Sequence, residues 1–189
     1  MIRTWCLAII ISVVAGIGTG HAEIIGIFSD SRGCPCEVTD RAGDVLLTIA
    51  VLHVDSPGAR GSRFSATKPA CLEVTYLYET AFFFALGNSQ TGISFDYGQC
   101  LTGTYQLLTI TFFAYGLTPD CCYFEVLPDP FAPSGEIEVI DCDNQVSFVS
   151  GLFDIVNSTE ICQCAPGPVE CHPVPAETST WGKIKTLYQ

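Results

Sequence analysis

The chain has 189 residues and a formal net charge of −12, with 20 acidic side chains against 8 basic ones. So strong a negative field disfavours binding to nucleic acid and to anionic membranes, and it favours solubility. The length suits one domain with a short leader and a tail.

The first 22 residues have the pattern of a secretory signal peptide. Arg3 supplies the positive start, an apolar run covers 7–17, and the small residues Gly20 and Ala22 precede the expected cut. The apolar run is too short to cross a bilayer comfortably. We therefore expect a mature chain of 23–189 with no transmembrane segment, located outside the cytosol as a secreted, periplasmic or cell-surface protein.

The chain from residue 23 to residue 151 consists of short segments rich in β-branched and aromatic residues. Turn sequences such as DSPGARG, GNSQTG and PDPFAPSG separate them. Strands at this spacing predict an all-β domain, a sandwich or barrel. The expected strands are 23–29, 43–54, 62–67, 71–79, 81–86, 92–98, 104–116, 122–127, 135–141 and 146–151.

Alternation along these segments predicts which side chains face the core. In 104–116 the residues of one parity are large and apolar: Leu108, Ile110 and Phe112. Those of the other parity are more polar: Leu107, Thr109 and Thr111. In 135–141 we expect Ile137 and Val139 to point inward and Glu136 and Glu138 to lie on a solvated face.

Ten cysteines remain once Cys6 leaves with the leader, and an even number in an exported chain predicts disulfides. About 945 pairings are possible, so the connectivity is open. The adjacent Cys121 and Cys122 point in opposite directions on a strand and need different partners, for which Cys100 and Cys142 are plausible. The candidates are Cys34, Cys36, Cys71, Cys100, Cys121, Cys122, Cys142, Cys162, Cys164 and Cys171.

Two Cys-x-Cys clusters lie near the two ends of the domain. Cys34–Cys36 and Cys162–Cys164 are expected to bridge the amino-terminal loop to the carboxy-terminal exit, with Cys171 just beyond. Zinc is the alternative, but the spacing differs from the usual C-x2-C pattern. We expect no metal site and no cofactor.

No catalytic motif is present: the sequence has no G-x-S-x-G, H-E-x-x-H, P-loop or G-x-G-x-x-G. His53 shares its parity with apolar strand residues and is expected to be buried, whereas His172 is expected in solvent. Paired carboxylates leave no local signature, so a glycan-active enzyme stays the least favoured alternative.

Three further motifs have an ordinary structural interpretation beside a functional one. Asp141–Asn144 is expected to be a turn, with calcium as the alternative. Asn157 begins a formal glycosylation acceptor, which matters only in a eukaryotic secretory route. One of the three consecutive phenylalanines must point outward, and Phe83 is a candidate contact residue, with burial as the preferred alternative.

The composition changes after Cys164. Residues 165–177 contain four prolines and are expected to form an extended linker. In the tail, 178–189, the apolar residues follow helical spacing and predict a short amphipathic helix: Trp181, Ile184, Leu187 and Tyr188. We expect this tail either to be a recognition or sorting element or to pack on its own domain.

The strand pattern GDVLLTIAVLHV, GSRFSAT, CLEVTYLY, GISFDYG and LLTITFFAYG resembles that of cohesin-like sandwiches. The chain is also similar to exported proteins of uncultured bacteria that contain a segment like PSGEIEVIDCD and end in T-W-G-x-I-K-x-L-Y. The resemblance implies a cohesin-like or immunoglobulin-like antiparallel β-sandwich over 23–164. Cohesins are not usually so rich in cysteine, so dockerin binding is not carried over.

These observations predict a non-catalytic, exported module for protein binding or for surface and structural assembly. Its partner would be another protein or a cell-surface component. The alternative is a carbohydrate-binding module, with calcium as a possible aid to binding.

Overall fold

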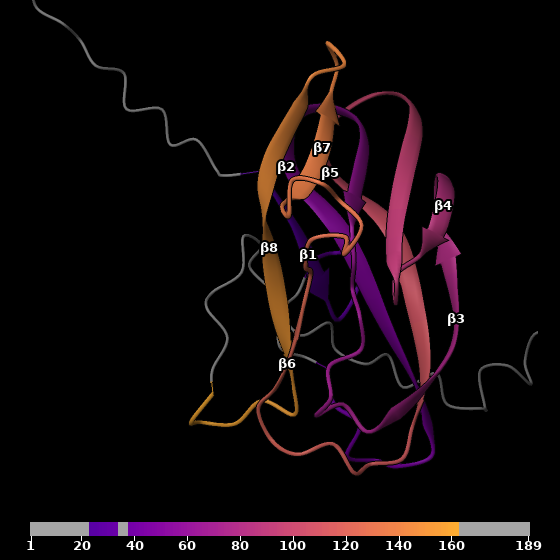
Figure 1. The fold of residues 1–189 in the computed structure, drawn as a ribbon. Helices are drawn as coiled ribbons and strands as arrows, with labels where there is room; N and C mark the ends of the chain where they lie inside the picture. The colour runs from indigo at the N-terminus through magenta and orange to yellow at the C-terminus, as the bar shows by residue number, and fades with distance from the viewer. Residues whose placement is uncertain (1–22, 34–37, 163–189) are drawn as a thin grey trace, which may run out of the picture.

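The computed structural model describes residues 23–33 and 38–162. The expected leader, linker and tail lie outside the described residues, as do Cys34, Cys36, Cys164 and Cys171. Within the described ranges the chain forms β-strands and no helix, so the predicted all-β class is confirmed (Figure 1). In these ranges there is accordingly no helix of the length and apolarity that crossing a bilayer requires.

The strands number eight within the described residues, and two of them are unusually long. They are β1 (Ile24–Phe28), β2 (Val45–Phe64), β3 (Val74–Ala81), β4 (Phe84–Asn88), β5 (Gly92–Ala114), β6 (Cys122–Glu125), β7 (Ile137–Asp141) and β8 (Val146–Val156). Strand β2 combines two expected strands with the DSPGARG segment between them, and β5 combines 92–98 with 104–116. The prediction of separate strands was wrong at both places.

Both long strands bend, β2 within the DSPGARG segment and β5 between Gly98 and Gly103, and the two bends pair with each other. Asp55 and Gly58 in β2 have positive φ, as do Gly98 and Gly103 in β5. Ser56 pairs with Gly103 across the bend, and the register shifts by bulges on either side. Bulges let a strand turn sharply without losing its ladder, so each strand continues from one layer into the other.

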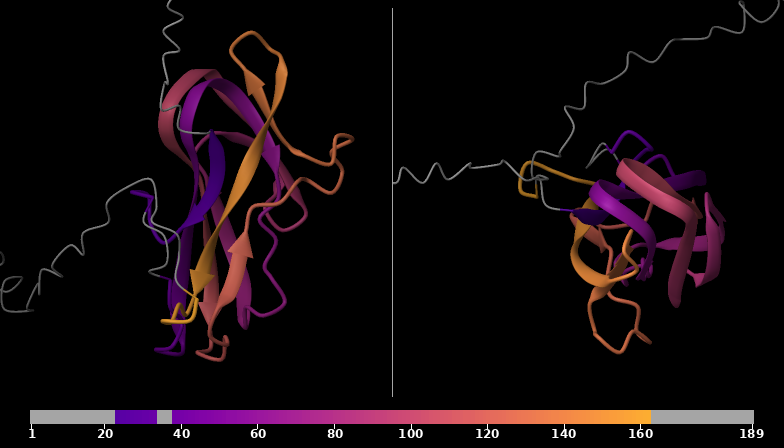
Figure 2. Two further views of the ribbon diagram at one scale, coloured as in Figure 1. Left: turned by 90° about the vertical axis from the view of Figure 1, so that its left-hand side faces the viewer. Right: turned by 90° about the horizontal axis from the view of Figure 1, so that it is seen from above.

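The domain is a sandwich of two layers that share β2 and β5 (Figures 1 and 2). The first layer contains β1, the start of β2, the end of β5, and β3. The second contains β4, the start of β5, the end of β2, β7 and β8. Strand β6 pairs antiparallel with the end of β8, from Phe153 to Val156. The predicted sandwich is confirmed.

Apart from the shared strands β2 and β5, strand pairing joins the layers along one side only. Strand β1 pairs antiparallel with β2 and parallel with β8 through Ile24, Ile25 and Gly26, so the sheet is not wholly antiparallel. On the opposite side, β3 and β4 each pair with β5 alone. That side is an open seam between two edge strands.

The core lies between the layers, and the predicted inward residues Leu108, Ile110 and Phe112 are fully buried there. The expectation of a more polar opposite face was wrong for Leu107, which is also in the core. The consecutive β2 residues Val51 and Leu52 pair with Leu108 and Gln106, which leaves Leu107 without a partner in this ladder. Leu107 is therefore a bulge residue and turns inward. Ile137 and Val139 are buried as predicted.

Disulfides and a buried amide fasten the lower end of the domain. Cys122 is buried and bonded to Cys71, while Cys121, a turn residue with a φ of 63°, is bonded to Cys162. The adjacent cysteines have different partners, as predicted, but the expected bridge from Cys162 to the amino-terminal loop was wrong. Asn157 is also buried, and its side-chain nitrogen donates to the Asp40 carboxylate at 2.7 Å and to the Thr118 carbonyl at 2.8 Å. The formal glycosylation acceptor is therefore a structural contact.

Candidate functional site

The most distinctive surface is the outer side of the second layer, which five strands build in register. In one row, Phe84 of β4, Asp96 of β5, Gly61 of β2, Ile140 of β7 and Val146 of β8 are successive cross-strand partners. The next row on the same side contains Leu86, Ser94, Arg63, Glu138 and Phe148. We call these two rows the five-strand face.

Large apolar side chains stand at both margins of the five-strand face. Phe84 is 67% exposed and Leu86 64% at the β4 margin, while Val146 and Phe148 are 57% and 58% exposed on β8. Monomeric proteins seldom expose apolar residues in such groups, and exposed patches mark interaction sites. The margins are therefore candidate contact residues of this face.

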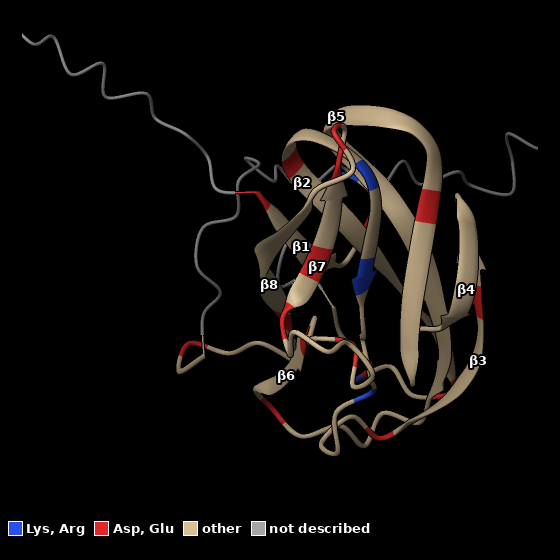
Figure 3. Ribbon diagram, turned by 45° about the horizontal axis from the view of Figure 1, so that its top comes forward, with Lys and Arg blue, Asp and Glu red and all other residues tan. Residues whose placement is uncertain are grey.

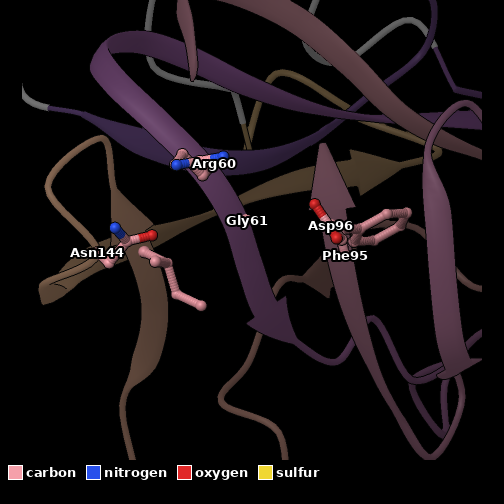
Figure 4. A pocket seen from close by; sticks show the side chains of 6 residues that line it. Arg60, Gly61, Phe95, Asp96 and Asn144 are labelled. Carbon is pink, nitrogen blue, oxygen red and sulfur yellow. The ribbon is translucent and has the colours of Figure 1, made fainter. Parts of the chain in front are cut away.

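Between the margins the face is hollowed at Gly61. A depression of about 330 Å³ is lined there by Arg60, Gly61, Asp96, Ile140 and Asn144, together with Phe95. Figure 4 shows the polar side chains of Arg60, Asn144 and Asp96 placed around Gly61. A Cβ at Gly61 would lie 2.5 Å from the Phe95 carbonyl oxygen, so a larger residue would displace the backbone. The hollow presents both hydrogen-bond donors and a carboxylate.

Arg63 forms ion pairs at the centre of the five-strand face. Its guanidinium Nε donates to the nearly buried Asp129 carboxylate at 2.7 Å, and a second nitrogen lies 4.0 Å from the Glu138 carboxylate. Asp129 also accepts from the Phe131 amide at 2.7 Å, which anchors the loop that precedes β7. Glu138 thus points to the outer side of the sheet, as predicted, and its side chain is 19% exposed beside Arg63.

The hairpin turn after β7 holds one edge of the depression. Asp141 accepts from the amides of Asp143 at 2.9 Å and Gln145 at 2.7 Å, and Asn144 has a φ of 62°. The predicted turn at Asp141–Asn144 is confirmed. Among the described residues, no group of three His, Cys, Asp or Glu side chains is placed to hold a metal.

A third disulfide ties this turn to the bend of β5. Cys100 is bonded to Cys142, so the proposed pairing of these two with Cys121 and Cys122 was wrong. The bends of β2 and β5 bring Cys100 beside the hairpin, which local sequence spacing does not reveal. Gly58 lies against the bridge, since a Cβ there would be 2.9 Å from the Cys142 sulfur.

A buried polar cluster surrounds His53 at the upper end of the core. The ring Nε2 lies 2.8 Å from a Glu23 carboxylate oxygen, which also accepts from the Ser56 hydroxyl at 3.0 Å. The ring Nδ1 lies 2.9 Å from the Tyr105 hydroxyl and 3.2 Å from that of Tyr97. Both nitrogens of His53 therefore have partners.

Burial controls protonation in this cluster. Loss of water lowers the pKa of His53, although the Glu23 carboxylate opposes this, so the ring is neutral at pH 7. Its Nε2–H then donates to Glu23, and its Nδ1 accepts from the tyrosines. Burial raises the pKa of Tyr105 to about 12 and that of Tyr97 further. A general base needs a nitrogen that reaches substrate, and fully buried His53 has none to offer; the predicted burial is confirmed.

The remaining predicted site residues have mixed outcomes. Phe83 is partly buried and packs against Tyr97 and Tyr105, with ring centroids 5.0 Å and 6.0 Å away, so it belongs to the edge of the core. Its neighbours Phe82 and Phe84 point outward instead. The tail residues Trp181, Ile184, Leu187 and Tyr188 lie outside the described residues, and their role stays a prediction.

Sequence reasoning did not identify the five-strand face. Parity along each strand separates outward from inward residues, and that signal was present for Phe84 and Leu86. The alignment of five strands depends on the registers across the bends of β2 and β5, which no local pattern reveals.

No family model matches the sequence, and no curated protein matches it. The chain is similar in structure to cohesin modules. The seventh type I cohesin of ScaB from Pseudobacteroides cellulosolvens is 15% identical, with a TM-score of 0.45 over 80% of this chain and 97% of that one. The sixth cohesin of scaffoldin B from Acetivibrio cellulolyticus, solved in complex with a dockerin, is 13% identical, with a TM-score of 0.49 over 74% and 100%. A non-cellulosomal cohesin from Archaeoglobus fulgidus is 14% identical, with a TM-score of 0.47 over 72% and 91%.

Proposed function

We propose that the protein is an exported, non-catalytic module that binds another protein through the five-strand face. The observation that carries the proposal is the pair of exposed apolar margins, Phe84 with Leu86 and Val146 with Phe148, on either side of a hollow lined by polar groups. Grouped exposed apolar residues mark interaction sites on protein surfaces, and aromatic side chains such as phenylalanine are enriched among the residues that anchor protein interfaces. Three disulfides support export, since such bonds persist in oxidising compartments.

The binding test compares two double variants of the full chain. Phe84→Asp with Phe148→Asp places charges on both margins of the face. The control, Leu46→Asp with Leu117→Asp, changes residues that are 64% and 70% exposed but lie outside the five-strand face. Proteins captured from the extracellular and envelope fractions of the source organism are identified, purified and titrated against each variant.

We expect the margin variant to bind its partner at least about tenfold more weakly, which is the size of effect when interface anchors are lost. The control variant should bind like the parent. Equal binding by both variants would contradict the assignment of the face. Saturable binding of the parent to a polysaccharide array, with no protein partner, would favour the carbohydrate-binding alternative instead.

A further inference from the structure

The exposed margins of the five-strand face raise the question of what covers them before a partner arrives. Burying apolar surface stabilises by about 25 cal/mol per Å², so a segment tethered nearby would gain from covering Phe84, Leu86, Val146 and Phe148. The chain continues for 27 residues after Cys162. We propose that residues 178–189 dock on the five-strand face of the same molecule and are displaced by the partner.

The linker is long enough for docking within one molecule. Fifteen residues, 163–177, separate Cys162 from the tail, and a proline-rich chain extends by about 3.1 Å per residue, or ~46 Å in all. A compact domain of this size has a radius of gyration of about 14 Å, so the extended linker is about three such radii long and can bring the tail from Cys162 to the five-strand face. Such tethering gives an effective concentration of about 1 mM.

The chemistry of the tail complements that of the face. Its apolar residues Trp181, Ile184 and Leu187 recur every three positions, and it carries Lys183 and Lys185 with no acidic side chain. The face offers apolar margins, and two acidic residues lie exposed beside its hollow, Asp96 within it and Asp143 in the β7–β8 turn, while Arg60 also lines the hollow. Figure 3 shows acidic positions in red on β5 and at the tip of the β7–β8 hairpin, with basic positions in blue on β2. Lysines would therefore meet carboxylates while the apolar residues cover the margins.

The dimensions also agree. Twelve residues in helical form are about 18 Å long, and five strands spaced about 4.8 Å apart span ~19 Å from the first axis to the last. A helical tail laid across the strands would extend from one margin toward the other, and its apolar residues, Trp181 to Tyr188, would cover about 10 Å of that span. This inference rests on the proposed function, because it assigns the same face.

Trp181 provides a direct test, since Trp5 is the only other tryptophan. In the full chain with Trp5→Phe, we expect Trp181 to emit at shorter wavelength than in the free peptide 178–189. Its quenching by acrylamide should be several-fold weaker than in the peptide. Adding Phe84→Asp with Phe148→Asp should restore the peptide's values, whereas Leu46→Asp with Leu117→Asp should not.

A second variant leaves the domain untouched. Lys183→Glu with Lys185→Glu should also expose Trp181, because it sets like charges against Asp96 and Asp143. Peptide-like emission in the parent, or emission unaffected by the margin variant, would overturn the proposal. Protection that disappears on dilution would mean docking on a second copy and would overturn docking within one molecule. None of these measurements uses the partner, so a negative result leaves the binding test of the face intact.

Discussion

At the scale of single residues, hydrogen bonds to specific partners stabilise the polar side chains that lie in the core. His53 is fully buried, yet each ring nitrogen has a partner, and Asn157 satisfies its amide with Asp40 and Thr118. A buried polar group without such partners would cost about 1–3 kcal/mol. Both residues therefore connect segments that are distant in sequence, and their hydrogen bonds offset the free-energy cost of burying them.

The lowered pKa of His53 makes stability depend on pH. At pH values between the ordinary histidine pKa of about 6.5 and the lower pKa of His53 in the folded protein, the unfolded chain binds a proton that the folded chain does not. Stability is therefore full above pH ~6.5 and falls as the pH drops, by at most about 1.4 kcal/mol per pH unit from this group.

The measurement is the free energy of unfolding from denaturant titrations at several pH values. The difference between the parent and His53→Gln should narrow as the pH falls below about 6.5, because the variant lacks this proton uptake. A difference that stays constant down to pH 5 would show that folding does not lower the pKa of His53.

At the level of elements, the bends of β2 and β5 determine the architecture, and the Cys100–Cys142 bridge fastens them to the β7–β8 hairpin. Gly58 fits against the bridge because it has no side chain. The three described disulfides differ in exposure: Cys100 lies in solvent, whereas Cys122 and Cys162 are 1% and 6% exposed. Access of thiolate to sulfur limits exchange.

We therefore expect Cys100–Cys142 to be reduced before the two bridges at the lower end. Limited reduction followed by alkylation and peptide mapping should label Cys100 and Cys142 first. Replacing both by alanine should lower the free energy of unfolding by about 2–4 kcal/mol, the usual value for a loop of this length. Earlier labelling of Cys71 and Cys122 would contradict the order of exposure.

On the scale of the whole molecule, the pairing of β1 with β8 joins the two layers along one side. Along the other side β3 and β4 do not pair with each other. Strand β1 has paired neighbours on both sides, whereas β3 and β4 pair with β5 alone. Edge strands have backbone groups without ladder partners, and local opening is easiest where few contacts hold a segment. The open seam should be the least stable part of the sandwich.

Native-state hydrogen exchange checks this expectation. Amides of β3 and β4 should exchange at least about tenfold faster than those of β1 and the centre of β5, which corresponds to roughly 1.4 kcal/mol of opening free energy. Equal protection in β1 and β3 would show that another segment covers the seam.

Sequence alone determined the all-β class, the disulfide chemistry, the burial of His53 and the turn at Asp141–Asn144, because each depends on local composition or on period-two alternation. It could not determine that DSPGARG continues a strand, that Leu107 turns inward at a bulge, or that Cys100 meets Cys142. Those features depend on which distant segments lie side by side. The five-strand face belongs to the same class: its residues are spread from Gly61 to Phe148, and only the pairing of two bent strands brings them onto one surface.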